Sequence, residues 1–137
     1  MNIVNFNDPN FMNSSLYQDF VNKNTSRGYL NIRAYAASLA LPIKGLNVVV
    51  FKNLDNKKVV FYSGTTDESG IIEKITLPTP SVSNNDETVP SSQDYDIEAT
   101  YENQKLSYKV VMYSNISVNQ NINVVPIMQV GGTSYGN

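Results

Sequence analysis

Apolar and polar residues alternate along short stretches of this chain, and glycine, proline and polar turns separate the stretches. In residues 29–36, apolar side chains occupy every second position, from Leu30 to Ala36. This period of two is typical of a β-strand with one buried face. Further alternating or β-forming stretches cover residues 46–51, 58–64, 71–77, 95–99, 106–113 and 116–125. The pattern predicts about seven short strands and no long helix.

The segments between these strands carry strong turn signals. Residues 42–45 combine proline with glycine, and residues 53–57 form a polar loop. Residues 66–70 end in Gly70, which we expect at positive φ. Residues 81–92 are the longest polar segment, and we expect them to loop over one end of the fold. Strands at this spacing predict an all-β fold, an antiparallel sandwich of two sheets.

Residues 1–27 differ from the rest, because they are polar, rich in asparagine and free of alternation. Ser15 and Gln18 have the spacing of a capping box, which predicts a short helix over residues 16–22. This arm either covers the open end of its own sandwich or docks on a neighbouring subunit. Both arrangements bury the same apolar face, which consists of Phe11, Met12, Leu16, Phe20 and Val21.

Two groups of side chains are candidates for contact with a partner. The first is the apolar face of the arm. The second is the outer face of the strand over residues 29–36, where aromatic and cationic side chains could form a stacking ridge for sugars or for another protein. Such side chains also occur on ordinary sheet surfaces. The predicted partner-binding residues are Phe11, Leu16, Tyr17, Phe20, Tyr29, Arg33 and Tyr35.

The sequence divides into three parts. Residues 1–27 form the arm with its short helix, residues 28–127 the sandwich domain, and residues 128–137 a glycine-rich tail. A length of 137 residues suits one domain with one core. The hydrophobic fraction of 41% permits such a core and excludes a largely disordered chain.

Charge and hydropathy narrow the range of partners. The net charge is −2 and the basic residues are spread thinly, so we expect no nucleic-acid partner. No apolar run approaches the roughly 20 residues needed to cross a bilayer. The N-terminal residues lack the basic and apolar segments of a secretory signal. We therefore expect either a cytoplasmic protein or one that reaches a cell or spore surface by another route.

Histidine, cysteine and tryptophan are all absent from the chain. The lack of cysteine excludes disulfides and thiolate chemistry. The lack of histidine removes the commonest general base and metal ligand. The lack of tryptophan weakens any platform for stacking on sugars. From these absences we predict that the chain is not an enzyme and uses neither a cofactor nor a metal.

Carboxylates offer two remaining arrangements for chemistry. Asp67 and Glu68 stand in a turn, but their spacing does not match a calcium-binding loop, and acidic residues favour turns in any case. Asp94, Asp96 and Glu98 share one strand face. Two carboxylates can act as acid and base in a cleft that separates their pKa values. On an exposed strand they simply form the solvated face, which is the interpretation we favour.

An isopeptide crosslink between lysine and asparagine is a further chemistry seen in some surface sandwiches. It requires a lysine, an asparagine and an acid buried together. Lys44, Lys58 and Lys74 lie beside turns or on polar faces. We therefore expect no such crosslink.

Four stretches resemble the carboxypeptidase-regulatory-like, or prealbumin-like, sandwich family. They are GYLNIRAYAASLALPIKGLNVVV, TTDESGIIEKITLPTP, YDIEA and NINVVPI. The sequence is most similar to bacterial copies from Firmicutes, in which a helix like YQDFVNKN precedes the first strand. The resemblance spans about residues 17–126 and implies an immunoglobulin-like or prealbumin-like sandwich. It implies little about activity, because the shared motifs are turns and strand ends.

The resemblance and the residues together leave two function classes. Our leading hypothesis is a structural or assembly module, a self-associating subunit of a bacterial surface or spore-associated structure, built as a homo-oligomer or filament through its arm and sheet edges. The alternative is a carbohydrate- or cell-wall-binding module that uses Tyr29, Tyr35, Tyr108 or Tyr113. Some relatives carry cell-wall-lytic domains, but the sequence continues only briefly past Pro126, so we expect no lytic role.

Overall fold

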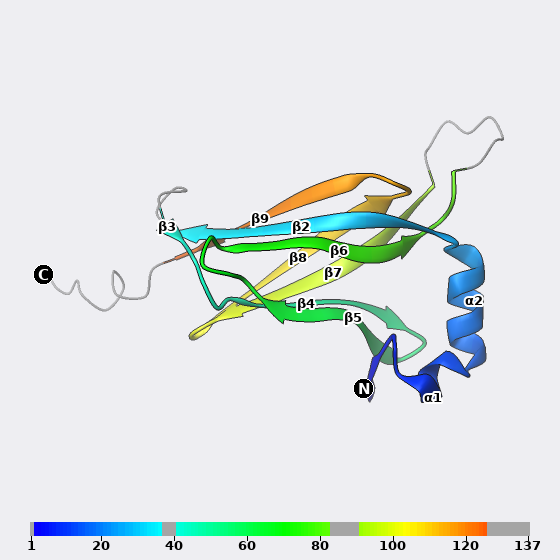
Figure 1. Ribbon diagram of the computed structural model, residues 1–137. Coiled ribbons are helices and arrows are strands. Elements are labelled where there is room, and N and C mark those ends of the chain that lie inside the picture. The colour runs from blue at the N-terminus through cyan, green and yellow to red at the C-terminus, as the bar shows by residue number, and fades with distance from the viewer. Residues whose placement is uncertain (1, 37–40, 83–90, 126–137) are drawn as a thin grey trace, which may run out of the picture.

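A computed structural model describes residues 2–36, 41–82 and 91–125 of the chain. Within these residues, two β-sheets pack face to face (Figure 1). The first sheet has the strand order β1 (Asn2–Asn5), β5 (Lys57–Thr65), β4 (Asn47–Leu54), β7 (Ser92–Tyr101) and β8 (Gln104–Tyr113). In the second sheet β2 (Ser26–Ala36) is central, with β6 (Ile71–Thr79), β3 (Leu41–Pro42) and β9 (Ser117–Val124) as its partners. The predicted two-sheet sandwich is confirmed.

The pairing departs from an entirely antiparallel sandwich in two places. β9 runs parallel to β2 over eight residue pairs, from Tyr29 with Ser117 to Ala36 with Val124. β1 runs parallel to β5. Since Tyr35 and Ala36 pair with both β3 and β9, these two strands must lie on opposite sides of β2.

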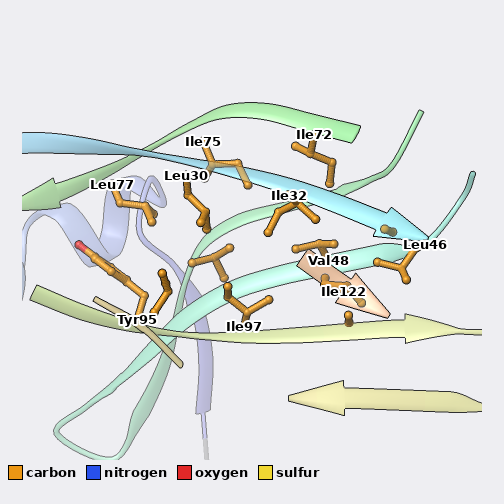
Figure 2. Close-up of a cluster of buried hydrophobic side chains, with 14 of the residues drawn as sticks. Leu30, Ile32, Leu46, Val48, Ile72, Ile75, Leu77, Tyr95, Ile97 and Ile122 are labelled. Carbon is orange, nitrogen blue, oxygen red and sulfur yellow. The ribbon is translucent and has the colours of Figure 1, made fainter. Parts of the chain in front are cut away.

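The core lies between the inner faces of the two sheets (Figure 2). The predicted alternation of β2 is confirmed, because Leu30, Ile32, Ala34 and Ala36 are all buried. Each fully buried large aliphatic side chain contributes roughly 1.5–3 kcal/mol. The facing side chains come from every long strand of both sheets: Leu46, Val48, Val50, Val59, Ile72, Ile75, Leu77, Tyr95, Ile97, Ala99, Val110, Met112, Ile122 and Val124.

Two turns follow directly from their residue types. Asp55 and Asn56 have φ angles of 49° and 66°, so they form the two-residue hairpin between β4 and β5 with both centres at positive φ. Gly70 has a φ of 76°, as predicted. Its N–H donates to the carbonyl of Asp67, while Asp67 Oδ1 accepts hydrogen bonds from the backbone of Ser69 and Ile71. The carboxylate of Asp67 therefore closes the turn.

The arm contains β1 and two helices, α1 (Pro9–Met12) and α2 (Ser15–Lys23). The predicted cap is wrong by one residue, because Ser14 caps α2 and its hydroxyl oxygen accepts from the N–H of Tyr17. Gln18 bonds the carbonyl of Met12 instead of closing a capping box. Figure 1 shows α2 lying across one end of the sandwich. Neither helix is long and apolar enough to span a membrane within the described residues.

One predicted loop and the predicted tail fall largely or wholly beyond the described ranges. Most of the polar segment over residues 81–92 and all of the predicted tail over residues 128–137 lie outside them. The first long strand, β2, begins at Ser26, two residues before the predicted start of the sandwich at Gly28. The division into three parts otherwise stays a prediction.

Candidate functional site

Arm and sandwich meet in a cluster of aromatic rings at one end of the two sheets. Phe6 follows β1, and its ring stacks on Phe61 of β5 with the centroids 4.5 Å apart. Phe20 of α2 lies 5.9 Å from Phe6 and 5.4 Å from Phe61. Phe61 meets the ring of Tyr95 on β7 at 5.0 Å, which connects the cluster to the core. The arm therefore covers the end of its own sandwich.

The four predicted partner-binding residues of the arm take part in this packing to different degrees. Phe11 and Phe20 are buried within the chain, so neither presents its ring to a partner in this conformation. Tyr17 is half-buried and packs edge-on against Phe11, with the centroids 5.8 Å apart. Leu16 is half-buried as well. Contact of Leu16 or Tyr17 with a partner stays a prediction.

Tyr29, Arg33 and Tyr35, the other predicted partner-binding residues, lie on the outer face of β2. The two tyrosines are six residues apart, which places them about 20 Å from each other along the strand. Tyr108, a further candidate for sugar stacking, packs against the core instead of lying on this face. The structure therefore does not gather Tyr29, Tyr35 and Tyr108 into one stacking platform.

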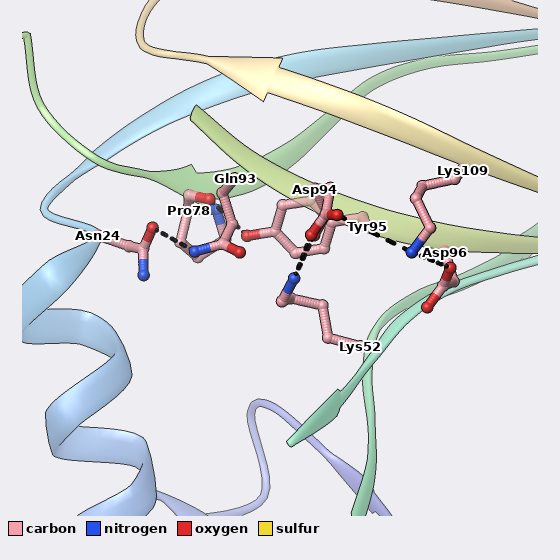
Figure 3. A network of polar contacts seen from close by, with 8 residues as sticks. All are labelled: Asn24, Lys52, Pro78, Gln93, Asp94, Tyr95, Asp96 and Lys109. Atoms are coloured by element: carbon pink, nitrogen blue, oxygen red, sulfur yellow. Dashed lines mark hydrogen bonds and ion pairs between the residues drawn. The ribbon is translucent and has the colours of Figure 1, made fainter. Parts of the chain in front are cut away.

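Asp94 is held by Lys52, whose side chain is only 13% exposed at the end of the sandwich (Figure 3). Lys52 Nζ lies 2.9 Å from Asp94 Oδ1 and also donates to the backbone carbonyl of Asp94. The hydrogen bond from Lys52 holds the pKa of Asp94 below its usual range. The hydroxyl of buried Tyr95 donates to the carbonyl of Pro78, and burial raises the pKa of Tyr95.

The other two acids on β7 are also paired with lysines, which come from β5 and β8. Asp96 lies 3.1 Å from Lys109 Nζ (Figure 3), and its hydrogen bond raises the pKa of that lysine. Glu98 lies 3.5 Å from Lys58 and 3.4 Å from Lys105. Acids that are each neutralised by lysines on a sheet face are not set up as an acid–base pair. This agrees with the predicted solvated face.

The remaining chemical candidates are occupied by structural contacts. In the described part of the chain, no three acidic side chains come together as a metal site. Glu68 is 3.7 Å from Lys44 on the surface, and Lys58 pairs with Glu98. Lys74 is exposed at a φ of 58°. None of the three lysines is buried beside both an asparagine and an acid, as an isopeptide crosslink requires.

Sheet edges are a different kind of candidate site, because their outer backbone groups are unpaired. Natural proteins usually protect such edges by short strands, bulges, proline or lysine. β1 has only four residues, and β5 bulges at Phe61 just beyond it. β8 carries Lys105 and Lys109. β6 contains Pro78 and a bulge beside Lys74, and β3 has two residues.

β9 carries none of these protections. Its eight residues include no charged side chain and no proline, and they pair with β2 in one unbroken register. Figure 1 shows it at the margin of the second sheet. No other strand in the described ranges pairs with its outer side. The sequence held a signal for this edge, the absence of charge from residues 117–124, but did not show which strand would lie at the margin.

The parallel pairing fixes which backbone groups of β9 are open. Tyr29 donates its N–H to the carbonyl of Ile116 at 3.0 Å, and successive bonds of a parallel ladder follow at every second residue. Even-numbered residues of β9 therefore bond to β2. Odd-numbered residues direct their N–H and C=O groups to the free edge: Ser117, Asn119, Asn121 and Asn123. Their side chains are exposed on the outer face.

Comparison with known proteins gives a fold but no sequence family. No family model matches the chain, and no curated protein sequence matches it. A 5-hydroxyisourate hydrolase from Klebsiella pneumoniae has a TM-score of 0.51 at 13% identity, over 72% of this chain and 90% of the hydrolase. An (S)-allantoin synthase has a TM-score of 0.52 at 8% identity, over 76% of this chain and 42% of the synthase. Transthyretin from Sparus aurata has a TM-score of 0.45 at 12% identity, over 71% and 90% of the two chains.

These comparisons contradict the prediction that the chain is not an enzyme. Two of the similar structures are a hydrolase and a synthase, so this architecture occurs in catalytic proteins. Missing histidine and cysteine exclude particular mechanisms, but they do not exclude catalysis as a class. At these identities the likeness establishes the fold alone. The chain shares the two-sheet β-sandwich fold of the hydrolase and the synthase.

Proposed function

We propose that this sandwich is an assembly module that joins to further copies of itself through the open edge of β9. The observation that carries the proposal is the contrast between the edges of the two sheets. Among the described strands, every other edge strand carries a bulge, a proline or lysines, or is very short. β9 has none of these features and offers four open residues, at every second position from Ser117 to Asn123. An extended strand added there would satisfy those N–H and C=O groups.

The mode of attachment differs from the one that the arm suggested. The arm's largest rings are used within the chain, which leaves the sheet edge as the better-supported contact. Two predictions accompany this proposal. One is that the chain belongs with the bacterial carboxypeptidase-regulatory-like proteins, and the other is that it lies on a cell or spore surface.

Replacing Asn121 with proline tests the proposed edge. The N–H of Asn121 points away from β2, so proline removes a donor from the free edge while the β2–β9 ladder keeps its bonds. We expect the unchanged chain to show a mass that rises with concentration in sedimentation equilibrium. Asn121→Pro should stay monomeric over the same range, with an association constant at least tenfold lower. Asn121→Ala is the matched control and should associate like the unchanged chain.

Two results would contradict the proposal. One is an unchanged chain that stays monomeric at millimolar concentration. The other is an Asn121→Pro variant that associates as strongly as Asn121→Ala while its thermal unfolding shows an intact fold, because another surface would then mediate assembly.

A further inference from the structure

We infer that the partner at this edge is a second copy of β9, running antiparallel and arranged so that Gln120 faces its own counterpart across a two-fold axis. The inference rests on the proposed function and adds the partner strand and its register. A two-fold axis brings the same edge of two copies together and runs the strands antiparallel. Such a pair closes as a dimer and does not extend into a filament.

One end of the open edge is set by a side chain from β8. Gln104 Oε1 accepts a hydrogen bond from the N–H of Val125 at 3.1 Å, and its Nε2 donates to the carbonyl of Val125. Both edge groups of Val125 are thereby satisfied within the chain. At the other end, Asn115 has a φ of 60° and lies in the turn before the strand. The open edge therefore spans Ser117 to Asn123.

The length of the open edge selects the register. Residues directly opposite each other in an antiparallel pair share a face, so odd-numbered residues must oppose odd-numbered ones. Centring on Gln120 sets Ser117 opposite Asn123 and Asn119 opposite Asn121. All four open residues of each copy are then paired.

In the neighbouring registers, some open residues of β9 have no available partner. Centring on Asn121 would set Ser117 opposite Val125, whose backbone groups already bond to Gln104. Centring on Asn119 would set Asn123 opposite Asn115, which lies outside the strand at positive φ. The structure thus favours the Gln120-centred pair over either alternative.

The side chains of β9 suit pairing with an identical strand. The strand has no charge, so two copies meet without repulsion. In the single chain, Gln120 Nε2 donates to the carbonyl of Asn121 at 2.9 Å and thus occupies one of the open edge acceptors. On pairing, that carbonyl receives the N–H of Asn119 from the second copy. The released amide of Gln120 then meets its counterpart, and each amide can both donate and accept.

Single cysteines test this register, because the natural chain has none. In the inferred pair, residue 120 faces itself as a non-hydrogen-bonded pair with Cα atoms about 4.5 Å apart, within the range of a disulfide. Gln120→Cys should therefore form covalent dimers in high yield under mild oxidation. Ser117→Cys is the matched control on the same strand. Its two copies would lie about 20 Å apart, so it should give at least tenfold less covalent dimer.

Further variants separate failure of the register from failure of the function. The double variant Ser117→Cys with Asn123→Cys should form covalent dimers, since these positions oppose each other. Gln120→Ala should still dimerise in sedimentation, because backbone groups of the odd-numbered residues, and not the Gln120 amide, join the two strands. Reversible dimers that crosslink through Asn121→Cys but not Gln120→Cys would overturn the register and leave the assembly edge intact. Monomers in every variant and in the unchanged chain would overturn both.

Discussion

Replacing Phe20 with alanine is expected to lower the free energy of unfolding by about 3–5 kcal/mol. Phe20 is only 7% exposed, and its ring contacts both Phe6 and Phe61. Its removal would leave a cavity where the arm meets the sandwich and would expose the ring of Phe61. Denaturant unfolding followed by tyrosine fluorescence measures this loss.

The control for Phe20 stands beside it on the same helix. Asp19 is exposed, and Asp19→Ala should change the free energy of unfolding by no more than about 0.5 kcal/mol. The Phe20→Ala loss should be the same at low and high protein concentration, because the ring packs within one chain. A loss that appears only at high concentration would mean that the arm serves a neighbouring copy instead.

The second large effect is expected for Gly70→Ala, at about 3 kcal/mol or more. Gly70 combines a φ of 76° with a crowded position. A Cβ there would fall well inside the contact distance of the carbonyl oxygen of Ala34 and 3.1 Å from the nitrogen of Ile43. These are backbone atoms of β2 and of the residue directly after β3. The N–H of Ile43 donates to the carbonyl of Ala34, so the two atoms cannot move aside without breaking that bond. Thermal unfolding measures the loss.

Gly45→Ala separates the backbone cost from the clash. Gly45 has a φ of 82°, similar to that of Gly70, but a Cβ there would meet nothing within 4 Å. Its substitution should therefore cost only the left-handed conformation, about 1–2 kcal/mol. Equal losses for the two variants would show that the space around Gly70 is not limiting.

Local patterns predicted much of this fold because they depend on neighbours in sequence. Alternation placed Leu30 and Ile32 in the core, and residue type placed Gly70 at positive φ. β1 was missed because Asn2–Asn5 is short and mostly exposed, so its residues carry no buried face to recognise. The parallel pairing of β9 with β2 joins segments that are more than eighty residues apart, and no local pattern encodes that contact.

For the candidate site too, features that depend on neighbours in sequence were predictable, whereas contacts between distant segments were not. The solvated face formed by Asp94, Asp96 and Glu98 could be anticipated from period two, although the lysines that neutralise it could not. The prediction of a buried apolar face on the arm is confirmed for Phe11 and Phe20 but wrong for Met12, which is exposed. That the arm covers its own chain instead of a neighbour depends on where Phe61 lies in space. The edge at β9 emerged only once the strand order of the sheets was known.

Amide hydrogen exchange along β9, measured at low and high protein concentration, tests the assembly edge most directly. Even-numbered amides bond to β2 and should be protected at both concentrations. The amides of Ser117, Asn119, Asn121 and Asn123 should exchange rapidly in dilute solution and become protected, by at least tenfold, when the chain is concentrated. Odd-numbered amides that exchange equally fast at every concentration, or that are already protected in the dilute monomer, would contradict assembly through this edge.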